Sequence, residues 1–449
     1  MISGCLPLNH DGQSVPLLTP PENFSQGNQQ QVTHYNSWWS SFRRPELDNL
    51  VDLSFNQNLN IQQALARVKQ ARALSVQSRS LLFPQINIEG DTRVDWDGSD
   101  RQRGETEIGS AFEWEIDAFG RLSSAVRSDR FRAQARQEDV NALRLALSAE
   151  IANAYFGAIA SQQTIDLLNQ QVTTDQELLS LLNLRLENGL GTNVEVLQQK
   201  SRVAESQSLI PLAQADLRVF ENRLDVLVGE IPDANNRVQK SETLDIENTL
   251  PAIGVPADLL LNRPDLRAAR AELVAIDADI ESAIADRLPR LTLDGAFQFS
   301  DTAFQTGPVS MIMASFIQPL IDWGRRKAEV ERNKAVYTEQ LAAFTQLYLE
   351  AVEDVENALY QENRQRDFLN KLDERRAILD KTVQETEARY KEGLDDYLPV
   401  LNALQELRNV ERLLILERLN LVEFRIALHR AVGGAITMNK PQESLDESL

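Results

Sequence analysis

The stretch Phe119-Gly120-Arg121 is one of two copies of a short pattern, because Trp323-Gly324-Arg325 follows it 204 positions later. A second pair of matching stretches, Gly189-Leu190 and Gly393-Leu394, has the same separation. Patterns that recur at one constant distance indicate an internal duplication. The structural unit is therefore one repeat of about 200 residues, and the second repeat is expected to fold in the same way.

Each repeat contains a long stretch that favours a helix. Between residues 121 and 188 there is no proline and a single glycine, Gly157, and between 325 and 392 there is neither. Both stretches are rich in Ala, Leu, Glu, Gln and Arg, which are strong helix formers. They predict helices over about 121–187 and 324–391, each roughly 100 Å long. Such lengths are typical of a coiled coil or an α-helical barrel, although the periodicity also fits an ordinary helical bundle.

The residues that follow each long helix predict a tight turn and a returning helix. Gly189 and Gly393 stand where C-cap glycines end a helix. Thr192 and Asp396 then stand where the N-caps of the next helices are expected.

Two runs of alternating apolar and polar residues precede each long helix and predict four β-strands, over about 85–97, 105–117, 290–300 and 308–321. We expect Met311 and Met313 on the apolar face, in contact with lipid. The polar face carries the carboxylates of Glu89, Asp91, Asp95, Glu113, Glu115 and Asp294. If that face lines a lumen, the pore should prefer cations.

Four strands cannot close a membrane barrel. An open sheet edge in lipid leaves backbone groups unpaired, at a cost of several kcal/mol each. Several chains would therefore have to share one barrel if these strands span a membrane. Two hairpins packed on a soluble core remain the alternative.

Composition and charge exclude several classes of function. The net charge of −21 argues against binding to a nucleic-acid backbone. Three histidines and one cysteine leave little room for a metal site, and no cofactor motif is present, so we expect neither metal nor cofactor. The single cysteine follows Ile2-Ser3-Gly4, which is typical of the end of a bacterial lipoprotein signal, and Cys5 would then be acylated. A chance match of four residues is the alternative.

Motifs along nearly the whole chain resemble the outer membrane factors, the TolC-like channels of tripartite efflux and type I secretion systems. They comprise Trp38-Trp39, Asn58-Leu59-Asn60-Ile61, Asn262-Arg263-Pro264-Asp265-Leu266, Asp322-Trp323-Gly324-Arg325 and Tyr390-Lys391-Glu392-Gly393. The resemblance implies a homotrimer in which each chain contributes four strands to a twelve-stranded outer-membrane β-barrel, continuous with a periplasmic α-helical barrel. It implies a mainly α-helical chain with membrane strands and a lipid-anchored outer-membrane location.

The same resemblance divides the chain into five parts. These are a lipid-anchor tether over 1–37, repeat 1 over 38–230, an equatorial linker over 231–256, repeat 2 over 257–434, and an acidic tail over 435–449.

The implied function is that of a passive conduit from periplasm to exterior, without enzymatic activity. A periplasmic adaptor, or membrane fusion protein, and an inner-membrane pump of the RND type would be its partners. By resemblance, Gly189, Leu190, Gly393 and Leu394 would contact the adaptor at the periplasmic tip. Plain helix caps for the glycines, and an apolar contact across each turn for the leucines, are the structural alternatives.

The aperture at the tip would be lined by Asp395 and Asp396, with Tyr390, Asn402 and Arg185 nearby. Asn402 stands where the family often has an aspartate, which puts direct transfer of an aspartate gate in doubt. Helix capping is the alternative role of the two aspartates. A type I protein secretion channel shares the expected fold, and a soluble coiled-coil scaffold is a further alternative. An enzyme ranks last, because the sequence shows no nucleophile elbow, phosphate loop or metal cluster.

Overall fold

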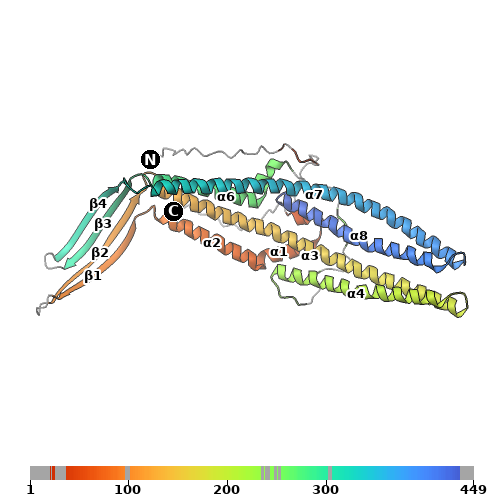
Figure 1. Ribbon diagram of the computed structural model, residues 1–449. Coiled ribbons are helices and arrows are strands. Elements are labelled where there is room, and N and C mark those ends of the chain that lie inside the picture. The colour runs from red at the N-terminus through yellow and green to blue at the C-terminus, as the bar shows by residue number, and fades with distance from the viewer. Residues whose placement is uncertain are drawn as a thin grey trace. The chain divides into compact units, whose positions relative to one another are not determined.

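The computed structural model describes residues 21, 23–25, 37–96, 102–233, 237, 243–246, 250, 254–301 and 306–434. Figure 1 shows long helices and one antiparallel sheet. The helices are η1 (Trp38–Phe42), α1 (Pro45–Gln57), α2 (Leu59–Ser80), α3 (Arg121–Glu187), α4 (Asn193–Val228), η2 (Pro256–Asp258), α5 (Leu259–Asn262), α6 (Pro264–Ala285), α7 (Arg325–Lys391) and α8 (Tyr397–Ala431). The strands are β1 (Gln85–Trp96), β2 (Gln102–Ile116), β3 (Arg290–Asp301) and β4 (Thr306–Ile317). Cys5 and the tail from 435 lie outside the described residues.

The chain forms two compact units that cut across both sequence repeats. The described part of one unit comprises Gln63–Val140 and Pro264–Tyr348, which contain the sheet. The other takes in residues 141–263 and 349–434 together with the segment before Gln63. The sheet explains part of this division, because β2 of the first repeat pairs with β3 of the second. The repeats are thus units of sequence, whereas each compact unit draws on both of them.

The four strands form a sheet in the order β1-β2-β3-β4, with β1 and β4 at the edges. The register places Glu113 opposite Asp294, and Asp91 opposite Glu107. Directly opposed residues of antiparallel strands share a face. Glu89, Asp91, Glu113, Glu115 and Asp294 therefore lie on one face, and Asp95 belongs to the same register series. The opposite face carries large apolar residues, among them Ile88, Ile108, Phe297 and Ile312.

The register of β4 corrects two expectations. Met313 lies opposite Asp294 and Met311 opposite Ala296, so both methionines share the face of the carboxylates and not the apolar face. The strand also ends at Ile317, four residues earlier than expected. Pro319, two residues further on, has no N–H to donate, which favours an end of the ladder there.

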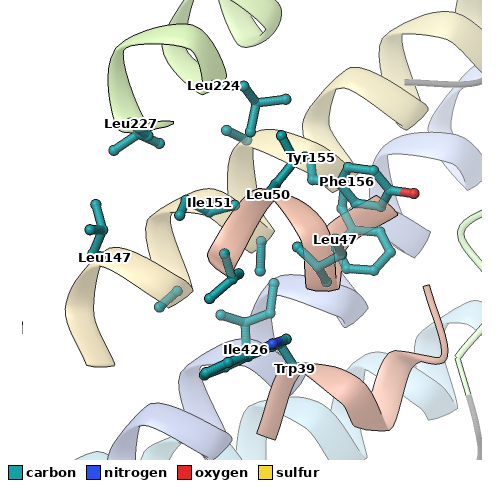
Figure 2. Close-up of a cluster of buried hydrophobic side chains, with 14 of the residues drawn as sticks. Trp39, Leu47, Leu50, Leu147, Ile151, Tyr155, Phe156, Leu224, Leu227 and Ile426 are labelled. Carbon is teal, nitrogen blue, oxygen red and sulfur yellow. The ribbon is translucent and has the colours of Figure 1, made fainter. Parts of the chain in front are cut away.

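One large apolar core lies in the second unit (Figure 2). Trp39 and Leu47 pack there with Tyr155 and Phe156 of α3 and with Ile426 of α8. The indole N–H of Trp38 donates to the Ser148 hydroxyl at 3.0 Å, so the buried ring keeps a polar partner.

The single glycine of the long α3 helix is part of its contact with α4. A Cβ at Gly157 would lie 2.5 Å from the Phe220 ring, so a larger residue there would force that ring to shift. None of the described helices is long and apolar enough to cross a bilayer.

Candidate functional site at the two helical turns

The turns after α3 and α7 have the same backbone geometry. In the first, the Leu190 N–H donates to the Arg185 carbonyl at 2.8 Å and the Gly189 N–H to the Leu186 carbonyl at 3.0 Å. In the second, the Leu394 and Gly393 N–H groups donate to the equivalent carbonyls, at 2.9 and 3.0 Å. This pair of bonds defines a Schellman motif. Gly189 and Gly393 have φ of +71° and +73°, which explains why glycine stands at both positions.

The leucine that follows each of these glycines projects into solvent. Leu190 is 69% exposed and Leu394 is 62% exposed. A Schellman motif often buries the residue at this position against the preceding helical turn. The exposure shows that the apolar contact across the turn, one alternative from the sequence, does not bury these side chains. Each turn therefore presents an apolar side chain that the chain itself leaves open.

The two returning helices begin differently. Thr192 forms a capping box with Glu195: the Glu195 N–H donates to the Thr192 hydroxyl at 3.3 Å, and the Thr192 N–H donates to the Glu195 carboxylate at 2.9 Å. Asp396 occupies the N-cap position of α8, but its side chain makes no capping hydrogen bond. Side-chain capping thus holds at the first turn and not at the second.

Asp395 is held by an ion pair within the second turn. The Arg389 Nε donates to its carboxylate at 2.5 Å and Nη2 at 3.3 Å. The hydrogen bond and the positive charge of Arg389 keep the pKa of Asp395 below its ordinary value. Asp395 therefore carries a neutralising partner, whereas Asp396 and Asn402 are exposed near the start of α8.

Arg185 and Tyr390 connect the first turn to the second. The guanidinium carbon of Arg185 lies 4.5 Å from the centre of the Tyr390 ring, and Arg185 Nη2 donates to the Leu190 carbonyl at 3.3 Å. Tyr390 is buried, with its ring centre 5.4 Å from that of Tyr397. Burial, together with the Glu195 carboxylate, raises the pKa of Tyr390. Its hydroxyl lies near Glu195 and Arg185.

A buried polar network lies deeper, between α3, α4 and α8. Asp175 of α3 accepts from Arg408 of α8 through both carboxylate oxygens at 2.7 Å, and from the Ser206 hydroxyl at 3.0 Å. The Tyr397 hydroxyl donates to Gln199 at 2.6 Å, and the Gln199 amide donates to Asp175 at 3.0 Å. Asp175 is fully buried and Arg408 is 4% exposed. Both repeats are thus tied together beneath the turns by a charged pair.

Sequence analysis missed this network and the Arg389 ion pair. The Thr192-x-x-Glu195 spacing was a usable signal for the capping box. Nothing in a single sequence distinguishes Asp175 or Arg408 from the many charged residues on the exposed helix faces. Their pairing depends on how α3 packs against α8.

The carboxylate face of the sheet is only partly free. Arg121 donates to both oxygens of Glu115, at 2.9 and 2.7 Å, so this carboxylate is neutralised. Asp294 accepts a hydrogen bond from the Thr292 hydroxyl at 3.2 Å, and this neutral group does not offset the carboxylate charge. The carboxylates that remain on this face lie on β1 and in the middle of β2, and Glu89 of β1 is exposed.

This architecture, a small antiparallel sheet in one chain with long antiparallel helical pairs, is that of outer-membrane channels that extend into the periplasm. The outer-membrane channel OprN superposes with a TM-score of 0.86, at 26% identity over 94% of this chain and 98% of that one. The pyoverdine export outer membrane protein OpmQ of Pseudomonas putida is 29% identical over 422 residues, which cover 90% of this chain and 89% of OpmQ. The toluene efflux pump outer membrane protein TtgF of the same species is 28% identical, over 89% and 85% of the two chains.

The chain belongs to the outer membrane efflux protein family, whose model matches residues 50–230 and 255–434. It is a TolC-like channel protein of the outer membrane that serves efflux. The family match favours efflux over the two alternatives that the sequence left open, protein secretion and a soluble scaffold.

Proposed function

We propose that three copies of this chain form a passive conduit of a tripartite efflux system, opened at its periplasmic tip by an adaptor and a pump. The sheet carries the proposal: it has one apolar face, one face with carboxylates, and two edges, β1 and β4, that pair on one side only. Edge strands in lipid need partners. Three such sheets joined edge to edge remove every edge, and the chain then performs transport without chemistry of its own.

The exposed leucines of the two turns support adaptor docking at Gly189-Leu190 and Gly393-Leu394. An apolar side chain left open by a rigid glycine turn is suited to a pocket on a partner protein. Asp395, Asp396, Tyr390, Asn402 and Arg185 lie at or beside these turns, where they would surround the aperture. TtgF is by name the outer membrane protein of a toluene efflux pump, and an RND-type pump is our proposal for the partner of this chain. Acylation of Cys5 would add a lipid anchor.

Planar bilayers test the conduit directly. Purified protein should give discrete conductance steps, with a reversal potential that indicates cation preference across a salt gradient. Glu89→Gln with Asp91→Asn should weaken the preference. Arg93→Gln, on the same register series, should strengthen it. Absence of any conductance would refute the conduit, and equal selectivity in all three proteins would refute the carboxylate lumen.

The lipid anchor has a separate test. Cys5→Ser should abolish incorporation of labelled palmitate and leave conductance unchanged. Equal labelling of both proteins would refute acylation at this residue.

A further inference from the structure

The loop between β4 and α7 exposes an unusual group of apolar side chains. Leu320 is 87% exposed, Ile321 is 79% exposed and Trp323 is 96% exposed. Trp323 also has φ of +54°, a left-handed backbone conformation that bulky residues seldom adopt. A large aromatic side chain in a strained, open position marks a surface with a function outside the chain's own core.

Cations follow this apolar group immediately. Arg325 and Lys327 are exposed in the first turn of α7. The four segments at this end of the sheet, 79–85, 115–123, 286–290 and 318–327, together hold seven cations and four carboxylates, in a chain with a net charge of −21. The local charge is therefore opposite to that of the whole protein.

The four carboxylates are already engaged. Glu115 accepts from Arg121, and Asp286 from Arg326 at 2.9 Å. Asp117 accepts from the Leu122 and Ser123 N–H groups, and Asp322 from the Gly324 and Arg326 N–H groups. Further along α7, Glu329 pairs with Arg332 at 2.6 Å. Among the described residues, no ion pair holds Arg325 or Lys327, and the Glu329 carboxylate acts on Arg325 only through longer-range attraction.

The first repeat shows what the second has gained. Phe119, which corresponds to Trp323, is 43% exposed, less than half the exposure of the tryptophan. Arg121, which corresponds to Arg325, is held by Glu115 through two hydrogen bonds. The next two positions are the buried, apolar Leu122 and the exposed, uncharged Ser123, where the second repeat has Arg326 and Lys327. The combination of a fully exposed aromatic ring and exposed cations is therefore found in the second repeat and not at the equivalent positions of the first.

We propose that segment 320–327 binds the phospholipid leaflet at the periplasmic edge of the outer membrane. Leu320, Ile321 and Trp323 lie at the boundary of acyl chains and headgroups, and Arg325 and Lys327 contact lipid phosphates. The apolar face of the sheet continues toward this segment through Ile312 and Phe316, which are 76% and 70% exposed. Tryptophan favours the membrane interface, and lysine and arginine beside it favour anionic headgroups.

A second copy of the chain is the other candidate occupant, and charge argues against it. A neighbour joined at β4 would present its β1 edge and the helix that precedes it. That helix, α2, contains four cations and no carboxylate. It would place like charges against Arg325 and Lys327, whereas a phosphate supplies the opposite charge.

Fluorescence quenching tests the position of Trp323. The full-length protein and its Trp323→Phe variant are placed in nanodiscs of phosphatidylglycerol with bromine at defined acyl carbons. The difference between the two emission signals isolates Trp323 from the other four tryptophans. We expect this difference signal to be quenched most by bromine near the headgroup. A signal that bromolipids leave unchanged would overturn the proposal, whether a second copy or water covers the ring.

Native mass spectrometry tests the cations. Arg325→Gln with Lys327→Gln should weaken phosphatidylglycerol retention on the assembled protein by about 25-fold, at about fivefold for each charge near a lipid surface. Lys371→Gln removes an exposed charge from the same helix, far from the loop, and should change nothing. Equal retention in the double variant and this control would refute the proposal. Competition by inorganic phosphate alone, with no protection of Trp323 by lipid, would also refute it, because the site would then bind free anions.

Discussion

The buried pair of Asp175 and Arg408 offers a sharp test of how the two helical hairpins are held together. Asp175→Asn removes the negative charge and leaves the Arg408 guanidinium buried at 4% exposure without its counter-ion. Loss of one partner of a buried ion pair costs about 3–5 kcal/mol. Since each 1.4 kcal/mol is tenfold, local opening around the pair should become about 140-fold to 3,700-fold more frequent.

Hydrogen exchange of backbone amides in α8 around Arg408 measures this opening. The matched control is Asp373→Asn, which breaks an exposed pair with Arg418 at 3.4 Å between the same helix, α8, and α7. An exposed pair contributes about 0–1 kcal/mol, so exchange in the control should rise fivefold at most. Adding Arg408→Gln to Asp175→Asn should recover part of the protection, because no charge is then left buried alone. Equal exchange in Asp175→Asn and Asp373→Asn would refute the reasoning.

Three further predictions concern the turns. Leu394→Ser should weaken binding of the cognate adaptor by at least tenfold, about 1.4 kcal/mol, in surface plasmon resonance. The control Leu416→Ser changes a leucine that is 52% exposed on α8 and should leave the affinity unchanged. Equal losses of affinity would exclude a specific docking role. Arg389→Gln should raise the pKa of Asp395 toward its ordinary value in a carbon-13 NMR titration. Because the ion pair lowers that pKa, it stabilises the folded turn at neutral pH, and this stabilisation is lost as the pH falls through the lowered pKa. An unchanged titration would show that the ion pair does not form in solution. Gly393→Ala should destabilise the turn by about 1–2 kcal/mol through its left-handed backbone alone, since no atom lies within 4 Å of the added Cβ; faster amide exchange at Leu394 would show it, and unchanged exchange would contradict it.

Much of the fold was predictable because local signals agree with the tertiary structure. The absence of proline and of all but one glycine indicated two long helices, and α3 and α7 have the expected extents. Alternation indicated the strands, since one face of the sheet meets a different environment from the other.

The faces of β4 were not predictable from hydropathy. Ile312 and Phe316 are as apolar as Met311 and Met313, so both faces of this strand are apolar. The sequence pattern of β4 therefore cannot tell which face joins the apolar face of the sheet. Only the pairing with β3 assigns Met313 to the side of Asp294.

The candidate site was predictable where it depends on backbone geometry. The glycine turns follow from local sequence, because few other residues adopt a positive φ. The side-chain partners do not, since Arg389 reaches Asp395 across the turn and Arg185 reaches Tyr390 from the other repeat. The Arg185–Tyr390 contact depends on the packing of helices that are about 200 residues apart in the chain, whereas the Arg389–Asp395 pair depends on how the turn orients two side chains six residues apart.

The mass of the conducting species tests the central claim most directly, namely that this sheet needs partner copies to line a conduit. Native mass spectrometry of the detergent-released protein that conducts in bilayers should give three chains of 50.6 kDa plus any lipid anchors. A conducting or stably folded single chain would contradict the account.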